Sequence, residues 1–360
     1  MFDYKHRIAA ARVLMEEAGA DVLLLSIGAD LPYFTGYQAM PLERLTMFVL
    51  RRDGDSVLVV PELEAPRVGA GPFELHPWSE TEDPIAIVAS LVGKAKRALI
   101  GDQTWSVFLL ELQERLPQTE FVSATPLTRK LRIRKDEEEI TRLRTAAAGL
   151  DRVVERLKDV RFSGRSERSL SQQVTAMTAE EDHDLPLFWI VASGPNSASP
   201  HHEPGARIIE PGDVVVVDFG GKHGGYCSDS TRTFSVGEPA ARQVEVHGLV
   251  REAQQAAREA VRPGVAAADI DRVARRVITD GGYGARFIHR TGHGIGLEGH
   301  EHPYLVEGNE ERLEPGMCFS IEPGIYLPGE FGVRIEDIVT VTATGVESLN
   351  NSDRSLIVVS

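Results

Sequence analysis

The chain has 360 residues, of which 42% are hydrophobic and 26% charged, which is ordinary for a globular protein with room for two domains. Lys and Arg number 39 against 54 Asp and Glu, so the formal net charge at pH 7 is −15. Nucleic acids and anionic membrane surfaces are bound through clustered Lys and Arg, and no basic run here exceeds a few residues, so we expect neither as a partner.

The cysteines and the N-terminal residues bear on the cellular compartment. Cys227 and Cys318 are too few for a disulfide framework, and we expect each to be a small buried apolar side chain. No apolar run approaches the ~18 residues that a membrane span requires. The first 20 residues also lack the apolar centre of a signal peptide. We therefore expect a cytoplasmic protein.

Helical and strand patterns alternate over residues 1–130, which predicts a smaller α/β domain. The first 20 residues have the pattern of an amphipathic helix, whose apolar face we expect to include Ile8, Val13, Leu14 and Ala18. The middle of three predicted strands folds back at Asp53-Gly54, a strong hairpin signal. The predicted strands are 21–26, 46–61 and 97–102, and the helical segments are 83–94 and 104–116.

A second domain is predicted over residues 131–360. Asp136, followed three residues later by Glu139, is a helix start signal. Short apolar runs bounded by Gly and Pro then alternate with long helical patterns. The further predicted helices are 166–182, 240–261 and 266–281, and the apolar runs are 213–221, 318–326 and 333–342.

Two aspartates flank a glycine-rich bend in the second domain. Asp218 ends the apolar run of 213–221, and Asp229 comes eleven residues later, after the bend at 220–225. A strand, a tight turn and a return strand can place the two carboxylates side by side, where both stay ionised only if a cation lies between them. The alternative is that Asp218 caps a turn and Asp229 is a solvated loop residue.

Two glutamates interrupt apolar runs further along the chain. Glu322 stands just before Pro-Gly, and Glu336 lies between Ile335 and Ile338. A carboxylate inside such a segment is costly unless it is paired or bound to a metal ion. For Glu336 the alternative is an ion pair with Arg334, two residues earlier on the same strand face.

His293 adds a nitrogen ligand to these four carboxylates. Two Asp, two Glu and one His suit two divalent ions, for which we expect Mn²⁺, with Co²⁺ or Zn²⁺ as alternatives. Two such ions roughly 3.5–4 Å apart can hold a bridging water and lower its pKa. The glycines at 292, 294 and 296 would let the backbone pass close to a crowded site.

These segments resemble the pita-bread metallopeptidases, the group that includes methionine aminopeptidase, aminopeptidase P and prolidase. The matching segments are DFGGKHGGYCSDSTRTF, HRTGHGIG, SIEPGIY and VRIED, in that order across the second domain. The resemblance implies an α+β fold, with a curved antiparallel sheet covered by helices. It also implies that Asp218 binds one metal ion, that His293 and Glu322 bind the other, and that Asp229 and Glu336 bridge the two. Thr231 resembles the hydroxyl that orients a ligand carboxylate.

The remaining histidines divide by position. His201, His289 and His300 fall where the proline-specific branch of the family carries active-site histidines that are not ligands, and the resemblance implies that they position the substrate and move protons. Arg334 fits the branch as a buried partner that ties the site to these histidines. His202 and His302 have no matching role, and we expect both on the surface or behind the site.

The domain over residues 1–130 resembles that of prolidases and aminopeptidases P, including the segment LPYFTGY (31–37). We therefore expect hydrolysis of the bond before proline, with Glu322 carrying a proton, and, by the resemblance, a homodimer. A dipeptidase must bind the free carboxylate of proline, and Arg44 in the loop 36–47 could do so. We favour a Xaa-Pro dipeptidase. The alternatives are an aminopeptidase P acting on longer peptides, with Arg44 a solvated loop residue, and an inactive peptide-binding module.

A G-x-G-x-x-G pattern at 294–299 could instead suggest a dinucleotide site. It is followed by HEHPY rather than by a helix, and no strand-helix-strand unit opens there. We therefore do not expect a dinucleotide cofactor.

Overall fold

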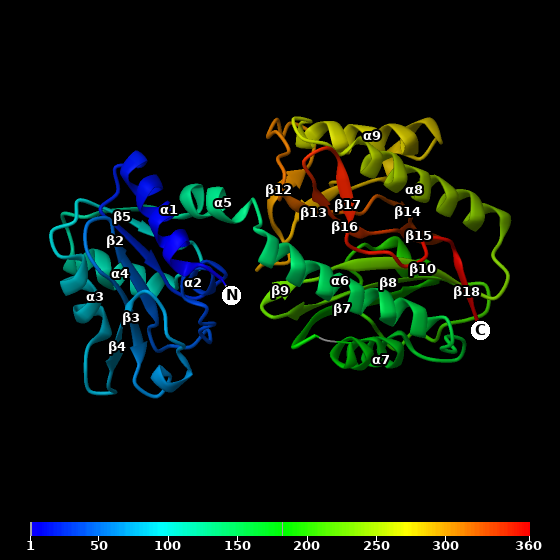
Figure 1. Ribbon diagram of the computed structural model, residues 1–360. Coiled ribbons are helices and arrows are strands. Elements are labelled where there is room, and N and C mark those ends of the chain that lie inside the picture. The colour runs from blue at the N-terminus through cyan, green and yellow to red at the C-terminus, as the bar shows by residue number, and fades with distance from the viewer. Residues whose placement is uncertain (1, 182) are drawn as a thin grey trace. The chain divides into compact units, whose positions relative to one another are not determined.

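The structure is a computed structural model that describes residues 2–181 and 183–360, and the chain forms two compact units, residues 1–132 and 133–360. Unit 1 is built on a six-stranded mixed sheet in the order β4-β3-β2-β1-β5-β6 (Figure 1). Its elements are α1 (Tyr4–Glu17), β1 (Val22–Leu25), α2 (Asp30–Thr35), β2 (Met47–Arg51), β3 (Ser56–Pro61), the short 3-10 helix η1 (Ala65–Arg67), β4 (Glu74–Trp78), α3 (Pro84–Val92), β5 (Arg97–Ile100), α4 (Ser106–Arg115), β6 (Glu120–Ser123) and α5 (Thr125–Arg132).

The local predictions for unit 1 are confirmed except for one helix face. Strands β2 and β3 pair antiparallel across the predicted hairpin, where Gly54 has φ 138°, a conformation that favours glycine. The predicted apolar face of α1 is wrong: Ile8 is buried together with Ala11 and Met15, while Val13 is 58% exposed. Residues spaced by three or four share one helix face, and Val13, five residues after Ile8, lies on the other side.

Unit 2 combines mostly antiparallel strands with two pairs of long helices, which confirms the predicted fold class. One sheet has the order β18-β10-β8-β7, with β9 beside β8, a second has the order β12-β11-β13-β16-β17, and β14 pairs with β15 in a third. The elements are α6 (Glu137–Leu157), α7 (Glu167–Glu180), β7 (Leu185–Ser193), η2 (Gly194–Ala198), β8 (Val214–His223), β9 (Tyr226–Cys227), β10 (Ser230–Val236), α8 (Ala241–Ala260), α9 (Ala267–Asp280), η3 (Gly284–Arg286), β11 (Gly292–Gly294), β12 (Glu301–Leu305), β13 (Cys318–Ile321), β14 (Gly324–Leu327), β15 (Phe331–Arg334), β16 (Asp337–Val341), β17 (Val346–Ser348) and β18 (Ile357–Val359).

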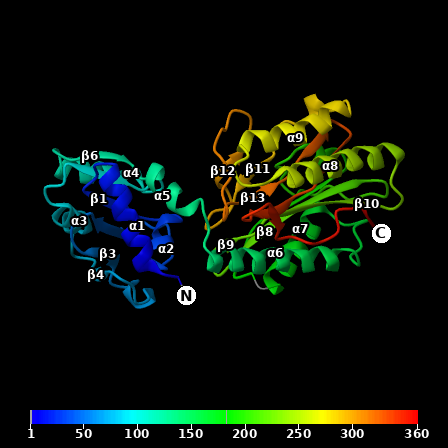
Figure 2. The same ribbon diagram turned by 45° about the horizontal axis from the view of Figure 1, so that its top comes forward.

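Each helix pair of unit 2 packs on its own side of the strands. Figures 1 and 2 show α6 and α7 on one side and α8 and α9 on the other. Leu150, Val174 and Val217 belong to the apolar core on the α6–α7 side, whereas Val250 and Phe319 belong to the core on the α8–α9 side. The strands between the two cores are therefore held rigidly from both sides, which suits them to position polar side chains.

Two further predictions about unit 2 are confirmed. The side chain of Asp136 accepts a hydrogen bond from the backbone of Glu139, and the Glu139 side chain accepts one from the backbone of Asp136, so α6 begins with the expected capping box. Cys227 and Cys318 are both free and buried. Among the described residues, no helix has both the length and the apolar character that crossing a membrane requires.

Candidate active site

The first two carboxylates of the site come from neighbouring strands. The turn after β8 contains Gly224 and Gly225, whose φ angles of 54° and 87° favour glycine, and it returns the chain toward β10. In the register of this pair Asp218 stands opposite Thr231. Asp229, two residues before Thr231, therefore lies diagonally across from Asp218 on the same face of the strands. The hairpin thus places the two carboxylates close together, as the sequence predicts.

The two glutamates enter from the second group of strands. Glu322 follows β13, and Glu336 lies between β15 and β16, where its backbone N–H donates to the Thr231 carbonyl at 3.1 Å. The Thr231 hydroxyl donates to Glu336 Oε2 at 2.8 Å. Thr231 therefore links the two groups of strands and orients one glutamate carboxylate, the kind of role that its position after Asp229 suggested.

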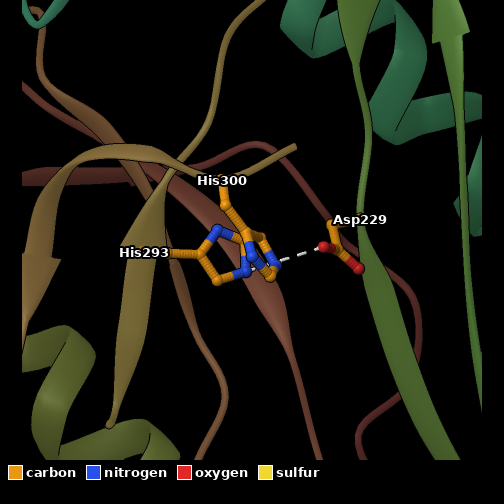
Figure 3. A group of neighbouring side chains, drawn as sticks. All are labelled: Asp229, His293 and His300. Atoms are coloured by element: carbon orange, nitrogen blue, oxygen red, sulfur yellow. Dashed lines mark ion pairs between the residues drawn. The ribbon is translucent and has the colours of Figure 1, made fainter. Parts of the chain in front are cut away.

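His293 on β11 points at three of these carboxylates. Its Nε2 lies 3.2 Å from Glu322 Oε1, 3.7 Å from Asp229 Oδ2 and 4.0 Å from Glu336 Oε1. Figure 3 shows His293 and Asp229 facing each other, with His300 beside the imidazole. The glycine before His293 has a steric cause, since a Cβ at Gly292 would lie 1.9 Å from the Ser320 carbonyl oxygen on β13.

The four carboxylates and His293 form two overlapping groups that suit metal ions. Asp218, Asp229 and Glu336 make one group, and His293, Glu322 and Glu336 make the other, with the ligand atoms of each group within 4.8 Å of one another. Glu336 belongs to both groups. Such a set, oxygen-rich with one nitrogen, fits two divalent cations that share a carboxylate.

Unsatisfied oxygens support the same assignment. Asp218 Oδ1, Asp229 Oδ1 and Glu336 Oε1 are buried and have no hydrogen-bond partner among the described residues. Burial, followed by the charges of neighbouring carboxylates, raises the pKa of Asp229 and of Glu336 well above their usual values. Cations bound between these groups would satisfy the oxygens and remove the repulsion that raises the pKa values.

Arg334 is buried and bonds to Asp218 rather than to Glu336. Its Nη2 donates to Asp218 Oδ2 at 2.6 Å, and its Nη1 donates to the Tyr326 hydroxyl at 2.9 Å. Among the described residues, no ion pair joins Arg334 to Glu336, so that alternative explanation of Glu336 is wrong. Burial alone would lower the pKa of Arg334, but the neighbouring Tyr326 and the carboxylates raise it well above its usual value. The guanidinium is therefore always charged.

Tyr326 is a site residue that the sequence analysis missed. It lies on β14 diagonally from Arg334 on β15, so both side chains share one face of this two-stranded sheet. Burial raises the pKa of its hydroxyl to about 12. A tyrosine within a buried apolar strand needs a polar partner, and that need was the only signal available in the sequence.

The accessory histidines line one cavity with the predicted ligands, but their ring nitrogens differ in availability. His201, His289 and His300 and all five predicted ligands border a cavity of about 850 Å³. His289 Nδ1 lies 2.7 Å from the Arg290 carbonyl, which only accepts, so Nδ1 carries the proton and Nε2 accepts from Tyr326 at 2.9 Å. Both nitrogens of His289 are therefore engaged, and direct contact with substrate would require the Tyr326 bond to open.

His300 is better placed to donate a proton or a hydrogen bond. Its ring lies 3.9 Å from that of His293, measured between centroids, and its Nδ1 accepts from Arg290 at 3.4 Å. A guanidinium only donates, so the proton of the neutral ring is on Nε2. Burial, followed by the charges of His293 and Arg290, lowers the pKa of His300 to about 4. His300 is therefore neutral near pH 7, with an N–H available on Nε2.

Three other residues singled out from the sequence lie elsewhere. Arg44 is in unit 1 and forms exposed ion pairs with Glu43 at 2.6 Å and Glu80 at 2.7 Å, and its role in substrate binding stays a prediction. His202 Nε2 lies 2.8 Å from the fully buried carboxylate of Glu167. His302 packs its ring against Tyr304, with 4.8 Å between centroids.

The fold and this arrangement of carboxylates and histidine define a class of metal-dependent hydrolases. Residues 141–343 match the metallopeptidase family M24, and residues 7–134 match the creatinase/prolidase N-terminal domain. The chain therefore belongs to metallopeptidase family M24, and it is an enzyme of the metallopeptidase class.

Three relatives each cover at least 95% of the chain. A probable dipeptidase, PepE, of Mycobacterium tuberculosis is 43% identical over 99% of this chain and 96% of its own length. A Xaa-Pro dipeptidase of Lactobacillus helveticus is 36% identical over 95% of this chain and 96% of its own. The crystal structure of a prolidase from Thermococcus sibiricus superposes with a TM-score of 0.95 at 38% identity, covering 99% of this chain and 100% of that one.

Proposed function

We propose that this protein is a Xaa-Pro dipeptidase, which hydrolyses the peptide bond before proline in dipeptides with the help of two divalent metal ions. The observation that carries the proposal is the pair of metal-ligand groups sharing Glu336 at the wall of one cavity. The likeness to proteins named Xaa-Pro dipeptidase and prolidase supports the substrate class. The imide nitrogen of proline has no hydrogen to donate, so a dedicated site is needed for this bond.

In the proposed mechanism Asp218 would help to hold one ion, His293 and Glu322 would help to hold the other, and Asp229 and Glu336 would serve both. When bound, the two ions supply a polarised scissile carbonyl and a water of lowered pKa. Glu322 takes the proton of the attacking water and passes it toward the leaving proline nitrogen. His300 donates its Nε2–H to the oxygen on which negative charge develops, because its Nδ1 already accepts from Arg290.

His201 and the Arg334 network complete the proposed site. His201 is exposed within the cavity, where it can orient the substrate. Arg334 holds Asp218 and, through Tyr326, fixes the ring of His289. Mn²⁺ as the bound metal, a homodimeric assembly and a cytoplasmic location belong to the same proposal.

Hydrolysis of three peptides by purified protein with added Mn²⁺ tests the proposal. A Xaa-Pro dipeptide, the matching Xaa-Pro-Yaa tripeptide and the matching Xaa-Ala dipeptide separate the alternatives. We expect the Xaa-Pro dipeptide to be cleaved at least tenfold more efficiently than the other two. Preferential cleavage of the tripeptide would identify an aminopeptidase P instead. Binding of the dipeptide without any hydrolysis would indicate a peptide-binding module.

A further inference from the structure

Arg290 is a cation on the wall of the candidate active site. The proposed mechanism does not yet give it a contact with the substrate. It directly follows His289 and borders the same cavity as the predicted ligands. Of the two arginines that border this cavity, Arg334 is 3% exposed and committed to Asp218, whereas Arg290 is only partly buried. Arg290 can therefore reach a molecule that enters the cavity.

The guanidinium of Arg290 forms no ion pair with any carboxylate of residues 2–181 and 183–360. The contrast with Arg44 is direct, because Arg44 already has two carboxylates, Glu43 and Glu80, within 2.7 Å. An anion that approached Arg44 would have to compete with these partners, and one that approached Arg290 would not.

The guanidinium of Arg290 is nevertheless held in place. Its central carbon lies 4.4 Å from the centre of the Tyr304 ring, and its Nη2 donates to His300 Nδ1 at 3.4 Å. Stacking on an aromatic ring orients the planar fork but leaves other N–H groups able to donate. An arginine held in this way loses little conformational freedom when it binds a carboxylate, which favours tight and directional binding.

The position of Arg290 agrees with the short distance between the scissile bond and the C-terminal carboxylate of a dipeptide. In a dipeptide, the carboxylate carbon of proline lies only roughly 3–4 Å from the scissile carbonyl carbon, since one residue separates them. His300 contacts the ligand His293 on one side, at 3.9 Å between ring centroids, and Arg290 on the other. Arg290 is thus separated from the ligand His293 by one imidazole ring, which is near enough for its guanidinium to meet the C-terminal carboxylate of a bound dipeptide.

We propose that Arg290 binds the free C-terminal carboxylate of the substrate and thereby selects dipeptides over longer peptides. This inference rests on the proposed function and names the group that recognises the end of the substrate. It competes with the prediction for Arg44. In a longer peptide this carboxylate is replaced by a neutral amide, which cannot form a charged pair with the guanidinium.

The experiment compares a Xaa-Pro dipeptide with its C-terminal amide in the wild type and four variants. Arg290→Gln removes the charge, Arg290→Lys keeps the charge without the fork, and Arg44→Gln tests the competing residue. Arg286→Gln is the matched control, because Arg286 is exposed, lies four residues away and does not border the cavity. The measured quantity is the ratio of kcat/KM for the free acid to kcat/KM for the amide.

We expect the wild type and the Arg286→Gln and Arg44→Gln variants to favour the free acid by about 10- to 100-fold, the range of a charge-assisted hydrogen bond. In Arg290→Gln the ratio should fall to near one, because hydrolysis of the free acid should fall far more than hydrolysis of the amide, and Arg290→Lys should be intermediate. An equal loss for both substrates in Arg290→Gln would overturn the proposal, because Arg290 would then act only through His300. A collapse of the ratio in Arg44→Gln alone would assign the carboxylate to Arg44.

Failure of the proposed function would be visible separately. If the wild type hydrolyses neither substrate, the dipeptide activity is disproved, and the same two compounds become uncleaved ligands for calorimetry. Tighter binding of the free acid than of the amide in the wild type, lost in Arg290→Gln, would still support carboxylate recognition by Arg290. Equal binding of the two compounds by the wild type would overturn it.

Discussion

Replacing Glu167 by Gln should destabilise unit 2. It should also disturb the candidate active site, although Glu167 does not border the cavity. Glu167 is the first residue of α7 and is fully buried. Its Oε1 accepts from the Ser193 backbone and hydroxyl and from Asn196, and its Oε2 accepts from His202 Nε2 at 2.8 Å and from the Gly205 backbone at 3.2 Å. One carboxylate therefore holds both ends of the segment that carries His201.

The expected magnitude follows from these five hydrogen bonds. A glutamine oxygen can replace one carboxylate oxygen, but the amide NH₂ then faces donors, so at least two charge-assisted bonds are lost. At ~1.5 kcal/mol each, the free energy of unfolding should fall by about 3 kcal/mol. For a unit of this size the midpoint of thermal unfolding would fall by roughly 6–12 °C. Displacement of His201 by even ~1 Å would lower kcat/KM by about 10- to 100-fold.

The pH of the assay matters for this variant. Burial alone would raise the pKa of Glu167, but hydrogen bonds from His202, Ser193 and Asn196 outweigh burial and lower the pKa. The stabilisation by a carboxylate with a lowered folded-state pKa is complete above its unfolded pKa of about 4.3, and it is lost as the pH falls through the folded value. Measurements at pH 7 therefore detect the whole effect.

Unfolding in urea and hydrolysis of a Xaa-Pro dipeptide, measured at pH 7, form the assay for Glu167→Gln. Glu180→Gln is the matched control, because Glu180 ends the same helix and its ion pair with Arg156 is exposed, so a change of at most about 1 kcal/mol is expected. A loss of stability with unchanged kcat/KM would refute the view that Glu167 positions His201. An unchanged free energy of unfolding would refute the assigned magnitude.

Two further predictions concern Tyr326 and His247. Tyr326→Phe keeps the ring but removes the hydroxyl that connects Arg334 to His289. The kcat should therefore fall about tenfold, while the free energy of unfolding changes by less than about 2 kcal/mol. An unchanged kcat would show that His289 needs no support from Tyr326. Burial, followed by the charge of Arg251, lowers the pKa of His247 on α8 to about 4, below the unfolded value of ~6.5. Because the unfolded chain binds this proton first, stability is complete above pH 6.5 and falls as the pH drops toward 4, by about 2 kcal/mol between pH 7 and pH 5. Urea unfolding of His247→Leu should show a free energy of unfolding that falls less between pH 7 and pH 5 than that of the wild type. An identical pH dependence in the variant and the wild type would contradict the role given to His247.

The sequence was most informative where polar residues break an apolar pattern. Asp218, Glu322 and Glu336 each interrupt or end a β-patterned segment, where a lone buried carboxylate is costly, and Asp229 follows the glycine bend. The resemblance to the metallopeptidases then implied that all four are ligands. The turn between β8 and β10 could be recognised because two adjacent glycines, Gly224 and Gly225, favour a turn. Local rules of this kind also predicted the start of α6 and strands such as β1, β5 and β8, but not the long strand β7.

Residues whose role depends on partners far away in the chain could not be recognised from the sequence. Glu167 has the pattern of an ordinary acidic residue in the first turn of a helix, and its partners lie 26 to 38 residues later. Tyr326 resembles any aromatic residue in a strand, and Arg290 any loop arginine, until the fold places them beside Arg334 and His300. The buried face of α1 was predicted wrongly because Val13 does not lie on the helix face, with Ile8, Ala11 and Met15, that is buried in unit 1.

Metal analysis of the purified protein tests the central claim most directly, namely that the four carboxylates and His293 hold two metal ions. After dialysis against Mn²⁺ and removal of unbound metal, we expect two equivalents per chain in the wild type. One equivalent or less is expected in Asp229→Asn and in Glu336→Gln, because each removes a proposed bridging carboxylate. Fewer than two equivalents in the wild type, or two in both variants, would contradict the account.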